Sequence, residues 1–331
     1  MLKLYRGLVV GKFMPLHRGH QLLIETALSR VDDLTIVVYD STVRGKFPAM
    51  PIEKRIKWIA DLYPDVENIV PRKDLYDGLY PPEIKDSAIY SVGYAMNLRF
   101  LGHFDYVFSS EDYGEPFAKE LKSEHVTVDA ARKLVPISGT KIRENVFENR
   151  GYIDPHVYRS LIQKVVFVGT ESTGKTTLAK ALAEQLNTLW TPEYGRELWE
   201  AQGGSGSFAD LRLIANNQYR REQAAALHSR DYLFCDTNAW TTLQWCMLYN
   251  HTVDARLINL VEETKDEYIW FLCDNDFDWV DDGLRELKNN SKEFHQQNRN
   301  DLDKRGINYI VLSGTLDERI KTVKETLGIE S

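Results

Sequence analysis

The sequence predicts an α/β protein of two domains, each built on a doubly wound parallel sheet. Its 331 residues exceed the size at which one hydrophobic core usually stops growing. Short apolar runs alternate with segments of helical periodicity, the pattern of strands joined by crossover helices. Two of these runs, ending at Val10 and Val168, lead directly into a polar turn that contains glycine. Ligands of such sheets bind at the carboxyl ends of the strands, so we expect a binding site in each half.

Composition and charge argue against several classes of protein. Hydrophobic residues make up 43% and charged residues 27% of the chain, as in soluble globular proteins, and a net charge of -8 argues against a general nucleic-acid-binding surface. Cys235, Cys246 and Cys273 follow no disulfide or zinc spacing. No apolar run approaches the roughly 20 residues of a membrane span, and no leader pattern precedes the first strand. We therefore expect a cytoplasmic protein without membrane or nucleic-acid partners.

The first polar turn follows residues 8–10 and precedes a helical pattern that begins at Leu22. It reads G-K-F-M-P-L-H-R-G-H over residues 11–20. His17 and His20, in the spacing H-x-G-H, can donate ring N–H groups to one anionic group, and Gly19 permits close approach of the backbone. Later segments of this half are expected as strands at 34–39, near 69, at 106–109 and at 126–128, and as helices at 51–62 and 84–101.

A second polar motif, I-S-G-T-K-I-R at residues 137–143, opens a helix after the last of these strands. By spacing alone, Ser138 is also a plausible N-cap and Arg143 a plausible solvated helix residue. The two motifs together resemble the nucleotidyltransferase superfamily, and most of all its nicotinamide-mononucleotide adenylyltransferases. The resemblance implies that the hydroxyl, the helix N-terminus and the arginine of the second motif hold the phosphates of ATP.

These residues suffice for nucleotidyl transfer, in which a phosphate oxygen attacks the α-phosphate of ATP and pyrophosphate leaves. Both reactants are already anionic, so positioning and charge neutralisation replace a strong base. We expect the charge to come from the catalytic candidates Lys12, His17, His20 and Arg143, and from Lys141. The predicted phosphate-binding residues are Gly11, Phe13, Gly19, Ser138, Thr140 and Lys141.

The helix expected at residues 51–62 carries two predicted substrate contacts, Arg55 and Trp58. The indole of Trp58 could stack on a pyridinium ring. A core aromatic is an equally good interpretation of the same residue.

The second polar turn is a phosphate loop. Residues 164–168 form an apolar run, G-T-E-S-T-G-K-T follows at 169–176, and a helical pattern continues from Leu178. The glycines let successive backbone N–H groups point at the β-phosphate, and the helix adds its positive dipole end. Lys175 is expected to reach the β- and γ-phosphates, and Thr176 to bind Mg²⁺. The predicted phosphate-binding residues are Gly169, Thr170, Glu171, Ser172, Thr173, Gly174, Thr176 and Thr177.

Two acidic residues follow the next expected strands. Glu193 lies in T-P-E-Y-G-R at residues 191–196, where nucleoside-kinase-like folds commonly place a base; a surface turn is the alternative. Tyr194 and Arg196 of this stretch are predicted substrate contacts. Asp236 ends the apolar run 232–235, as a Walker B aspartate does, and would hold Mg²⁺ or accept the hydroxyl proton. It therefore competes with Glu193 for the role of base.

A strand expected at residues 268–273 ends in a run of acidic residues and the sequence W-V-D-D-G-L-R at 279–285. A calcium loop is disfavoured, because the Gly and terminal Glu of an EF-hand are missing. A kinase lid fits better: Arg285 could close over the γ-phosphate while Trp279 or Asp278 meets the acceptor. The last strand is expected at residues 309–312.

Together these motifs resemble the bifunctional nicotinamide-mononucleotide adenylyltransferase / ribosylnicotinamide kinase family of bacterial NAD salvage. The resemblance implies a Rossmann-like nucleotidyltransferase domain over residues 1–155 and a P-loop kinase domain over 156–331. It also implies ATP, ribosylnicotinamide, nicotinamide mononucleotide and NAD as ligands and Mg²⁺ as cofactor, and it allows a homo-oligomer. Some members carry an N-terminal helix-turn-helix segment; here the first strand begins within ten residues of Met1, so the resemblance does not imply repressor activity.

Two other functions remain open from the sequence. One is a pantetheine-phosphate or cytidylyl transferase fused to a different small-molecule kinase, which only the acceptor pockets would distinguish. The other is a nucleotide-sensing regulator with one inactive domain. The presence of His17, His20, Lys175 and Asp236 argues against the regulator.

Overall fold

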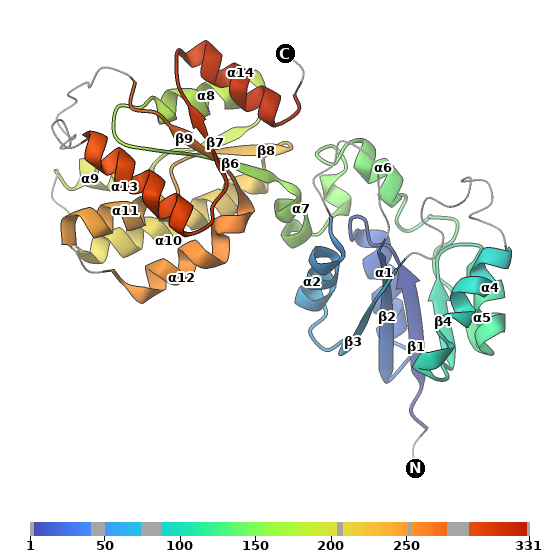
Figure 1. Cartoon of the computed structure of the whole chain (residues 1–331). Helices are drawn as coiled ribbons and strands as arrows, with labels where there is room; N and C mark the ends of the chain where they lie inside the picture. Colours follow the sequence, from blue (N-terminus) through green and yellow to red (C-terminus); the bar gives the residue numbers. More distant parts are fainter. Residues whose placement is uncertain are drawn as a thin grey trace. The chain divides into compact units, whose positions relative to one another are not determined.

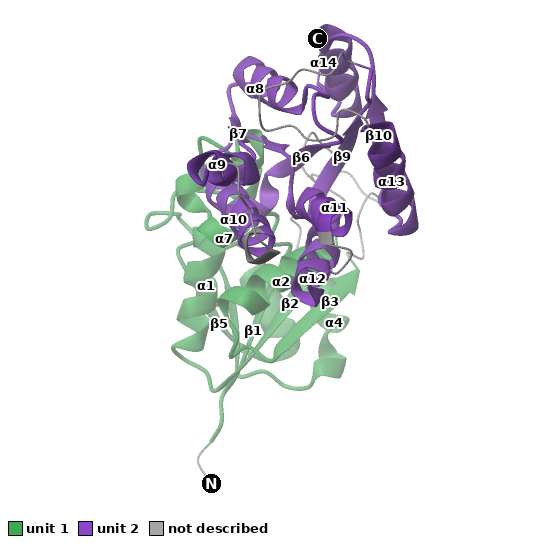
Figure 2. Ribbon diagram, turned by 90° about the vertical axis from the view of Figure 1, so that its left-hand side faces the viewer, with its two compact units in different colours: residues 1–158 green, residues 159–331 purple. Residues whose placement is uncertain are grey.

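The computed structural model describes residues 3–40, 50–73, 88–203, 208–250, 253–276 and 291–329. The chain divides into two compact units, residues 1–158 and 159–331 (Figures 1 and 2). Within the described residues, each unit contains one five-stranded sheet whose paired strands run parallel, which confirms the predicted fold class. The boundary expected between residues 155 and 156 lies at the start of α7 (Pro155–Leu161), the helix in which one unit ends and the next begins.

Unit 1 has the strand order β3-β2-β1-β4-β5. Its strands are β1 (Arg6–Gly11), β2 (Asp33–Asp40), β3 (Asn68–Lys73), β4 (Tyr106–Ser109) and β5 (Glu124–Thr127). Its helices before α7 are α1 (Arg18–Leu28), α2 (Ile52–Leu62), α4 (Ala88–Met96), α5 (Gly114–Leu121) and α6 (Gly139–Glu144), with 3-10 turns η1 (Arg99–Leu101) and η2 (Arg150–Tyr152). The order reverses between β1 and β4, so the switch point lies beside the carboxyl end of β1.

Helices cover both faces of the unit 1 sheet, which explains its continuous apolar strands. Leu8 and Val10 of β1 point to the face that packs against Ala95 of α4 and Phe117 of α5. The opposite face, with Val9, is covered by α1 and α2 (Figure 1). β1 and β2 pair in parallel from Arg6↔Asp33 to Gly11↔Val38. The carboxyl ends of both strands therefore lie on the same side of the sheet.

Unit 2 has the strand order β10-β9-β6-β8-β7. Its strands are β6 (Gln163–Val168), β7 (Leu189–Thr191), β8 (Tyr232–Asp236), β9 (Tyr268–Cys273) and β10 (Tyr309–Leu312). Its helices after α7 are α8 (Lys175–Gln185), α9 (Tyr194–Ala201), α10 (Phe208–Ala226), α11 (Ala239–Asn250), α12 (Ala255–Thr264), α13 (Ser291–Lys304) and α14 (Leu316–Thr326), with the 3-10 turn η3 (Lys265–Glu267). The central strand β6 lies between β8 and β9 and ends in the phosphate loop.

The core of unit 2 has the same three-layer organisation. Val165 and Phe167 of β6 pack with Leu178 and Leu182 of α8 and with Val323 of α14 on one face. The other face lies under α10, α11 and α12 (Figure 1). Because both faces are covered, all four residues from Val165 to Val168 are fully buried, as the uninterrupted apolar run predicts. None of the helices in the described part of the chain is both long and apolar enough to cross a membrane.

Candidate functional site

Unit 1 contains a cavity of about 550 Å³ at the carboxyl ends of its strands, a size suited to a nucleotide-sized ligand. The turn after β1, the loops after β4 and β5, and the start of α6 all contribute to its walls. Of the predicted residues, those that line it are Gly11, Lys12, Phe13, His17, Gly19, His20, Ser138, Thr140 and Arg143. The fold therefore brings two motifs, more than 100 residues apart in sequence, around one cavity.

The two histidines of the first motif form a reciprocal cap at the N-terminus of α1. The Nδ1 atom of His17 accepts a hydrogen bond from the backbone N–H of Gly19 (3.1 Å), and the Nδ1 atom of His20 accepts one from the backbone N–H of His17 (3.4 Å). The rings stack with their centroids 3.8 Å apart. Because Nδ1 is the acceptor in both rings, a neutral imidazole carries its proton on Nε2. The spacing H-x-G-H thus fixes the orientation of both rings, and the His20 ring also hydrogen-bonds the backbone of Pro15.

Burial, reinforced by Arg132 and Arg143, lowers the pKa of His17 to about 4. Burial and the neighbouring His17 lower the pKa of His20 well below its usual value. Both rings are therefore neutral near pH 7 in the absence of ligand. This corrects the expectation that the histidines supply positive charge: they offer neutral donors, and the charge at this cavity comes from Lys12, Arg132 and Arg143.

The second motif is fixed to the first through Arg143. Its guanidinium donates to the carbonyl of Met14 (2.6 Å) and to the hydroxyl of Thr140 (3.1 Å). Gly139 allows this approach, because a Cβ there would lie 2.9 Å from the same Met14 carbonyl. Ser138 combines both interpretations of its position: its hydroxyl caps α6 by accepting from the N–H of Lys141 (3.2 Å), and it also lines the cavity.

Three predicted residues of unit 1 lie elsewhere. Lys141 is exposed and is not among the residues that line the cavity. Trp58 is 2% exposed in the core, so the expected stacking on a substrate ring is not supported. The Arg55 side chain is fully buried and donates to the carbonyls of Lys12 and Tyr39 (both 2.7 Å). Helical periodicity correctly places these two residues on one face of α2, but that face packs on the sheet.

The loop after β5 adds residues that the motifs did not reveal. Arg132 lines the cavity and pairs with Glu111 from the loop after β4 (3.2 Å). Asp129 accepts hydrogen bonds from the backbone N–H groups of Lys133 (2.7 Å) and Val135 (2.9 Å), which holds the loop and lowers the pKa of its carboxyl. Neither residue belongs to a recognisable spacing, so sequence alone gave no signal for them.

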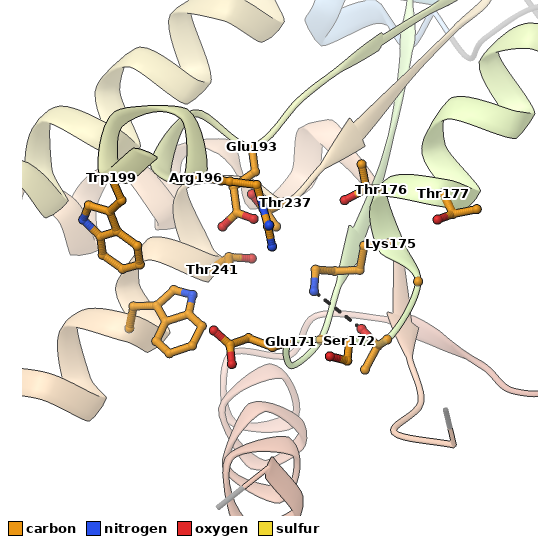
Figure 3. A pocket seen from close by; sticks show the side chains of 14 residues that line it. Glu171, Ser172, Lys175, Thr176, Thr177, Glu193, Arg196, Trp199, Thr237 and Thr241 are labelled. Atoms are coloured by element: carbon orange, nitrogen blue, oxygen red, sulfur yellow. Dashed lines mark hydrogen bonds between the residues drawn. The ribbon is translucent and has the colours of Figure 1, made fainter. Parts of the chain in front are cut away.

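Unit 2 has a smaller cavity of about 140 Å³ over the phosphate loop. Gly169 (φ 137°) and Gly174 (φ 77°) adopt conformations that other residues rarely reach, and a Cβ on Gly169 would lie 2.7 Å from the carbonyl of Cys273. The amine of Lys175 donates to the carbonyl of Thr170 (2.6 Å) and lies 3.5 Å from the hydroxyl of Thr173 (Figure 3). The loop therefore has the curvature typical of a phosphate loop.

The predicted phosphate-binding residues of this unit line the cavity with one exception. Those present are Gly169, Glu171, Ser172, Thr173, Gly174, Lys175, Thr176 and Thr177. Thr170 does not line the cavity: it is fully buried beneath the loop, and its hydroxyl accepts from Ser291 at the start of α13 (3.3 Å). Its carbonyl, rather than its side chain, takes part in the site.

Asp236 ends β8 beside the phosphate loop. The hydroxyl of Thr176 donates to its Oδ2 atom (2.5 Å), and its buried Oδ1 atom has no hydrogen-bond partner among the described residues. A hydroxyl beside a carboxylate with an unused oxygen is a donor set that suits Mg²⁺. The residues present thus fit the predicted cation.

Glu193 lies on the opposite wall of this cavity, at the N-cap of α9 (Figure 3). Burial and the nearby Asp236 raise the pKa of Glu193 to about 7, against the lowering effect of Lys175. Burial also raises the pKa of Asp236, opposed by Lys175 and by the hydrogen bond from Thr176. Glu193 lines the cavity, whereas Asp236 does not line it and lies against Thr176 of the phosphate loop. The positive charge of Lys175 favours the ionised form of both carboxyl groups.

Only some of the predicted residues in the T-P-E-Y-G-R stretch line the unit 2 cavity. Arg196 lines the cavity from the first turn of α9. Tyr194 does not: the guanidinium of Arg221 lies over its ring, 4.4 Å from the centroid, so its predicted substrate contact is not supported. The predicted lid residues Asp278, Trp279 and Arg285 lie outside the described residues.

Several cavity residues of unit 2 were not predicted. Trp199 from α9, Thr237 after β8, and Thr241 and Trp245 from α11 complete the lining (Figure 3). The indole N–H of Trp199 is buried without a partner in the described structure. Two tryptophans on separate helices thus line the same cavity as the loop. Their positions within helical periodicity are those of ordinary core aromatics, which explains why sequence reasoning missed them.

Arg319 of α14 supports the loop from behind. Its buried guanidinium donates to the carbonyl of Thr173 (2.7 Å) and pairs with Asp276 after β9. This contact joins residues 146 positions apart, and no motif predicts it.

Family comparisons agree with this division. Residues 8–145 match the cytidylyltransferase-like family, and residues 164–319 match the AAA domain family. The trifunctional NAD biosynthesis/regulator protein NadR of Escherichia coli (strain K12) is 30% identical over 346 aligned residues, which cover 97% of this chain and 83% of that protein.

Solved structures agree on the fold. A crystal structure of NadR protein in complex with NAD and AMP-PNP has a TM-score of 0.55 and covers 99% of this chain and 98% of its own, at 23% identity. A second structure, of NadR protein in complex with NR, has a TM-score of 0.57 and covers 98% of this chain and 97% of its own, also at 23% identity.

Proposed function

Because the chain belongs to the family of the NAD biosynthesis/regulator protein NadR, we propose that it catalyses two successive steps of NAD salvage. Unit 2 phosphorylates ribosylnicotinamide with ATP to give nicotinamide mononucleotide. Unit 1 transfers an adenylyl group from ATP to that product, which yields NAD and pyrophosphate. The regulatory activity named for the Escherichia coli relative is not part of the proposal.

In unit 2, the chemistry requires a phosphate cradle and a group that accepts the hydroxyl proton. The phosphate loop and Lys175 bind the β- and γ-phosphates of ATP. The acceptor hydroxyl lies against Glu193, whose carboxylate takes the proton as the hydroxyl oxygen attacks the γ-phosphorus and ADP leaves. Arg196 neutralises charge on the transferring group, and the indoles of Trp199 and Trp245 contact the acceptor base.

The cation of this unit is assigned to Thr176 and Asp236, whose oxygens fit Mg²⁺ as described above. When bound, Mg²⁺ neutralises phosphate charge and orients the nucleotide. Asp236 is then a ligand, and Glu193 is left as the base.

In unit 1, the nucleophile is a phosphate that is already ionised, so no base is required. The two Nε2–H groups of the histidine pair donate to the phosphate oxygens of ATP, and Arg143 and Lys12 neutralise the charge that develops as pyrophosphate leaves. Ser138 and the N-terminus of α6 bind the same phosphates. The roomier cavity suits two nucleotides joined end to end.

One observation carries the proposal: a single chain holds both a histidine-capped helix and a phosphate loop paired with two carboxyl groups. The test is incubation of the purified protein with ribosylnicotinamide, ATP and Mg²⁺, followed by chromatography and mass spectrometry. We expect nicotinamide mononucleotide, NAD, ADP and pyrophosphate. Phosphopantetheine and cytidine nucleotides, offered as alternative substrates, should give no product, and turnover of either in preference would overturn the proposal.

A further inference from the structure

The N-terminus of α9 has an unusual cap. Glu193 occupies the N-cap position, but its side chain makes no capping hydrogen bond and lines the cavity instead. The first N–H of the helix, that of Tyr194, is satisfied from another helix: it donates to the Oε1 atom of Gln218 in α10 (2.9 Å). An N-cap side chain accepts from the second or third N–H of its helix, so this bond does not replace a cap by Glu193. It joins the first residue of α9, which directly follows Glu193, to α10.

The amide of Gln218 is held in one orientation. Gln218 is 1% exposed, and its Nε2 atom donates to the Oε1 atom of Glu222, one turn further along α10 (3.4 Å). Glu222 is fully buried, and its Oε2 atom accepts a hydrogen bond from the hydroxyl of Tyr268 (2.5 Å). Since a carboxyl group takes the NH₂ end of the amide, the oxygen end is the one that faces Tyr194. Glu222 thus decides which end of Gln218 reaches α9.

We propose that Gln218, oriented by Glu222, is a positioning residue for phosphoryl transfer: it joins the first residue of α9 to α10 and so holds the adjacent Glu193 carboxylate in the cavity. This inference rests on the proposed kinase function of unit 2. Neither residue lines the cavity, and both act through the helix that carries Glu193 and Arg196. Gln218 and Glu222 therefore affect catalysis although neither touches the substrate.

The first test compares Gln218→Leu with the unaltered protein in phosphorylation of ribosylnicotinamide at saturating ATP. Loss of the acceptor releases the first residue of α9 from α10 and lets the adjacent Glu193 shift, so kcat should fall about 10-fold, which is about 1.4 kcal/mol in the barrier. The KM for ATP should stay within about 2-fold, because the phosphate loop is untouched. Asn216→Leu is the matched control, since Asn216 is an exposed amide of α10 that bonds to the carbonyl of Arg212 in its own helix. It should leave kcat unchanged.

A double variant separates positioning from simple loss of packing. In a Glu193→Gln background, Gln218→Leu should cost nothing further in kcat, because the group it positions is already gone. A further 10-fold loss there, or an unchanged kcat in the single variant, would overturn the inference.

Variants of Glu222 test the orientation step and remain usable if Gln218→Leu folds poorly. Glu222→Gln keeps an oxygen for the Gln218 amide and should retain kcat, whereas Glu222→Leu should lower it about as much as Gln218→Leu. Equal rates in the two Glu222 variants would contradict the role of Glu222. If the unaltered protein does not phosphorylate ribosylnicotinamide at all, the proposed function fails, and this inference fails with it; normal turnover with no response to these variants overturns the inference alone.

Discussion

The two sites begin with the same local structure, a strand that runs into a turn and a helix N-terminus, but they present opposite chemistry. In unit 1 the turn offers buried histidines that are neutral near pH 7, beside arginines, in a cavity of about 550 Å³. In unit 2 it offers backbone N–H groups and a lysine in a cavity of about 140 Å³ that Glu193 also lines. The pKa values of Glu193 and of the nearby Asp236 are both raised. The difference fits the two nucleophiles of the proposed reactions. An ionised phosphate needs only donors and charge, whereas a neutral hydroxyl needs a base.

The largest expected effect that would separate the two sites is that of substituting Lys175. Lys175→Ala removes the side chain that neutralises the β- and γ-phosphates, so phosphorylation of ribosylnicotinamide should fall by about 10³-fold or more. Conversion of supplied nicotinamide mononucleotide to NAD should persist, because that reaction belongs to the other core. Separate assays of the two steps check this, and equal loss of both in folded protein would contradict the two-site division.

Substitutions of Glu193 and Asp236 should affect different kinetic properties of the phosphorylation reaction. Glu193→Gln removes the proposed base and should lower kcat for phosphorylation by about 10²-fold or more, with little change in the Mg²⁺ requirement. Asp236→Asn removes a proposed cation ligand and should raise the Mg²⁺ concentration needed for half-maximal rate. Titration of Mg²⁺ in both variants gives the answer. If the Mg²⁺ requirement changes only in the Glu193 variant, the two roles are reversed.

In unit 1, His20→Ala should slow NAD formation about 10²-fold, the usual cost of one preorganised donor to phosphate charge, about 3 kcal/mol. Because His20 is neutral, His20→Gln, which keeps a neutral N–H donor, should recover part of the rate. Phosphorylation in unit 2 serves as the internal control. An unaltered rate of adenylyl transfer in His20→Ala would remove this residue from the site.

The smallest effect concerns stability. Burial raises the pKa of Glu222 from 4.5 to about 7, opposed by Lys164 and the hydrogen bond from Tyr268. Its contribution to stability is thus present below about pH 4.5 and is lost as the pH rises through 7, so unit 2 should lose roughly 2–3 kcal/mol between pH 5 and pH 8. Glu222→Gln should remove the Glu222 part of this loss and leave the part due to Glu193, whereas Glu184→Gln, on the exposed side of α8, should change nothing. Urea unfolding followed by tryptophan fluorescence measures both, since six of the seven tryptophans lie in unit 2.

The chain itself determined the parts of the sites that are local. The motifs at residues 11–20 and 169–176 each contain a strand end, a turn and a helix start, so a few consecutive residues specify both the backbone and the groups it presents. The order of alternating apolar and helical segments likewise predicted two parallel sheets, because crossover connections leave few other arrangements. Ser138 and Asp236 were found for the same reason: each directly follows a predicted strand or starts a predicted helix.

Only the tertiary structure decided which side chains reach the cavities. Trp58 lies on a helix face that packs on the sheet, while Trp199 and Trp245, with no distinguishing pattern, line the kinase cavity. Gln218 acquires its role because α10 packs against the first turn of α9, and Arg319 because α14 lies behind the phosphate loop. Helical periodicity predicts that a helix has a buried face. It does not predict which element or cavity that face contacts, because this depends on contacts between residues distant in sequence.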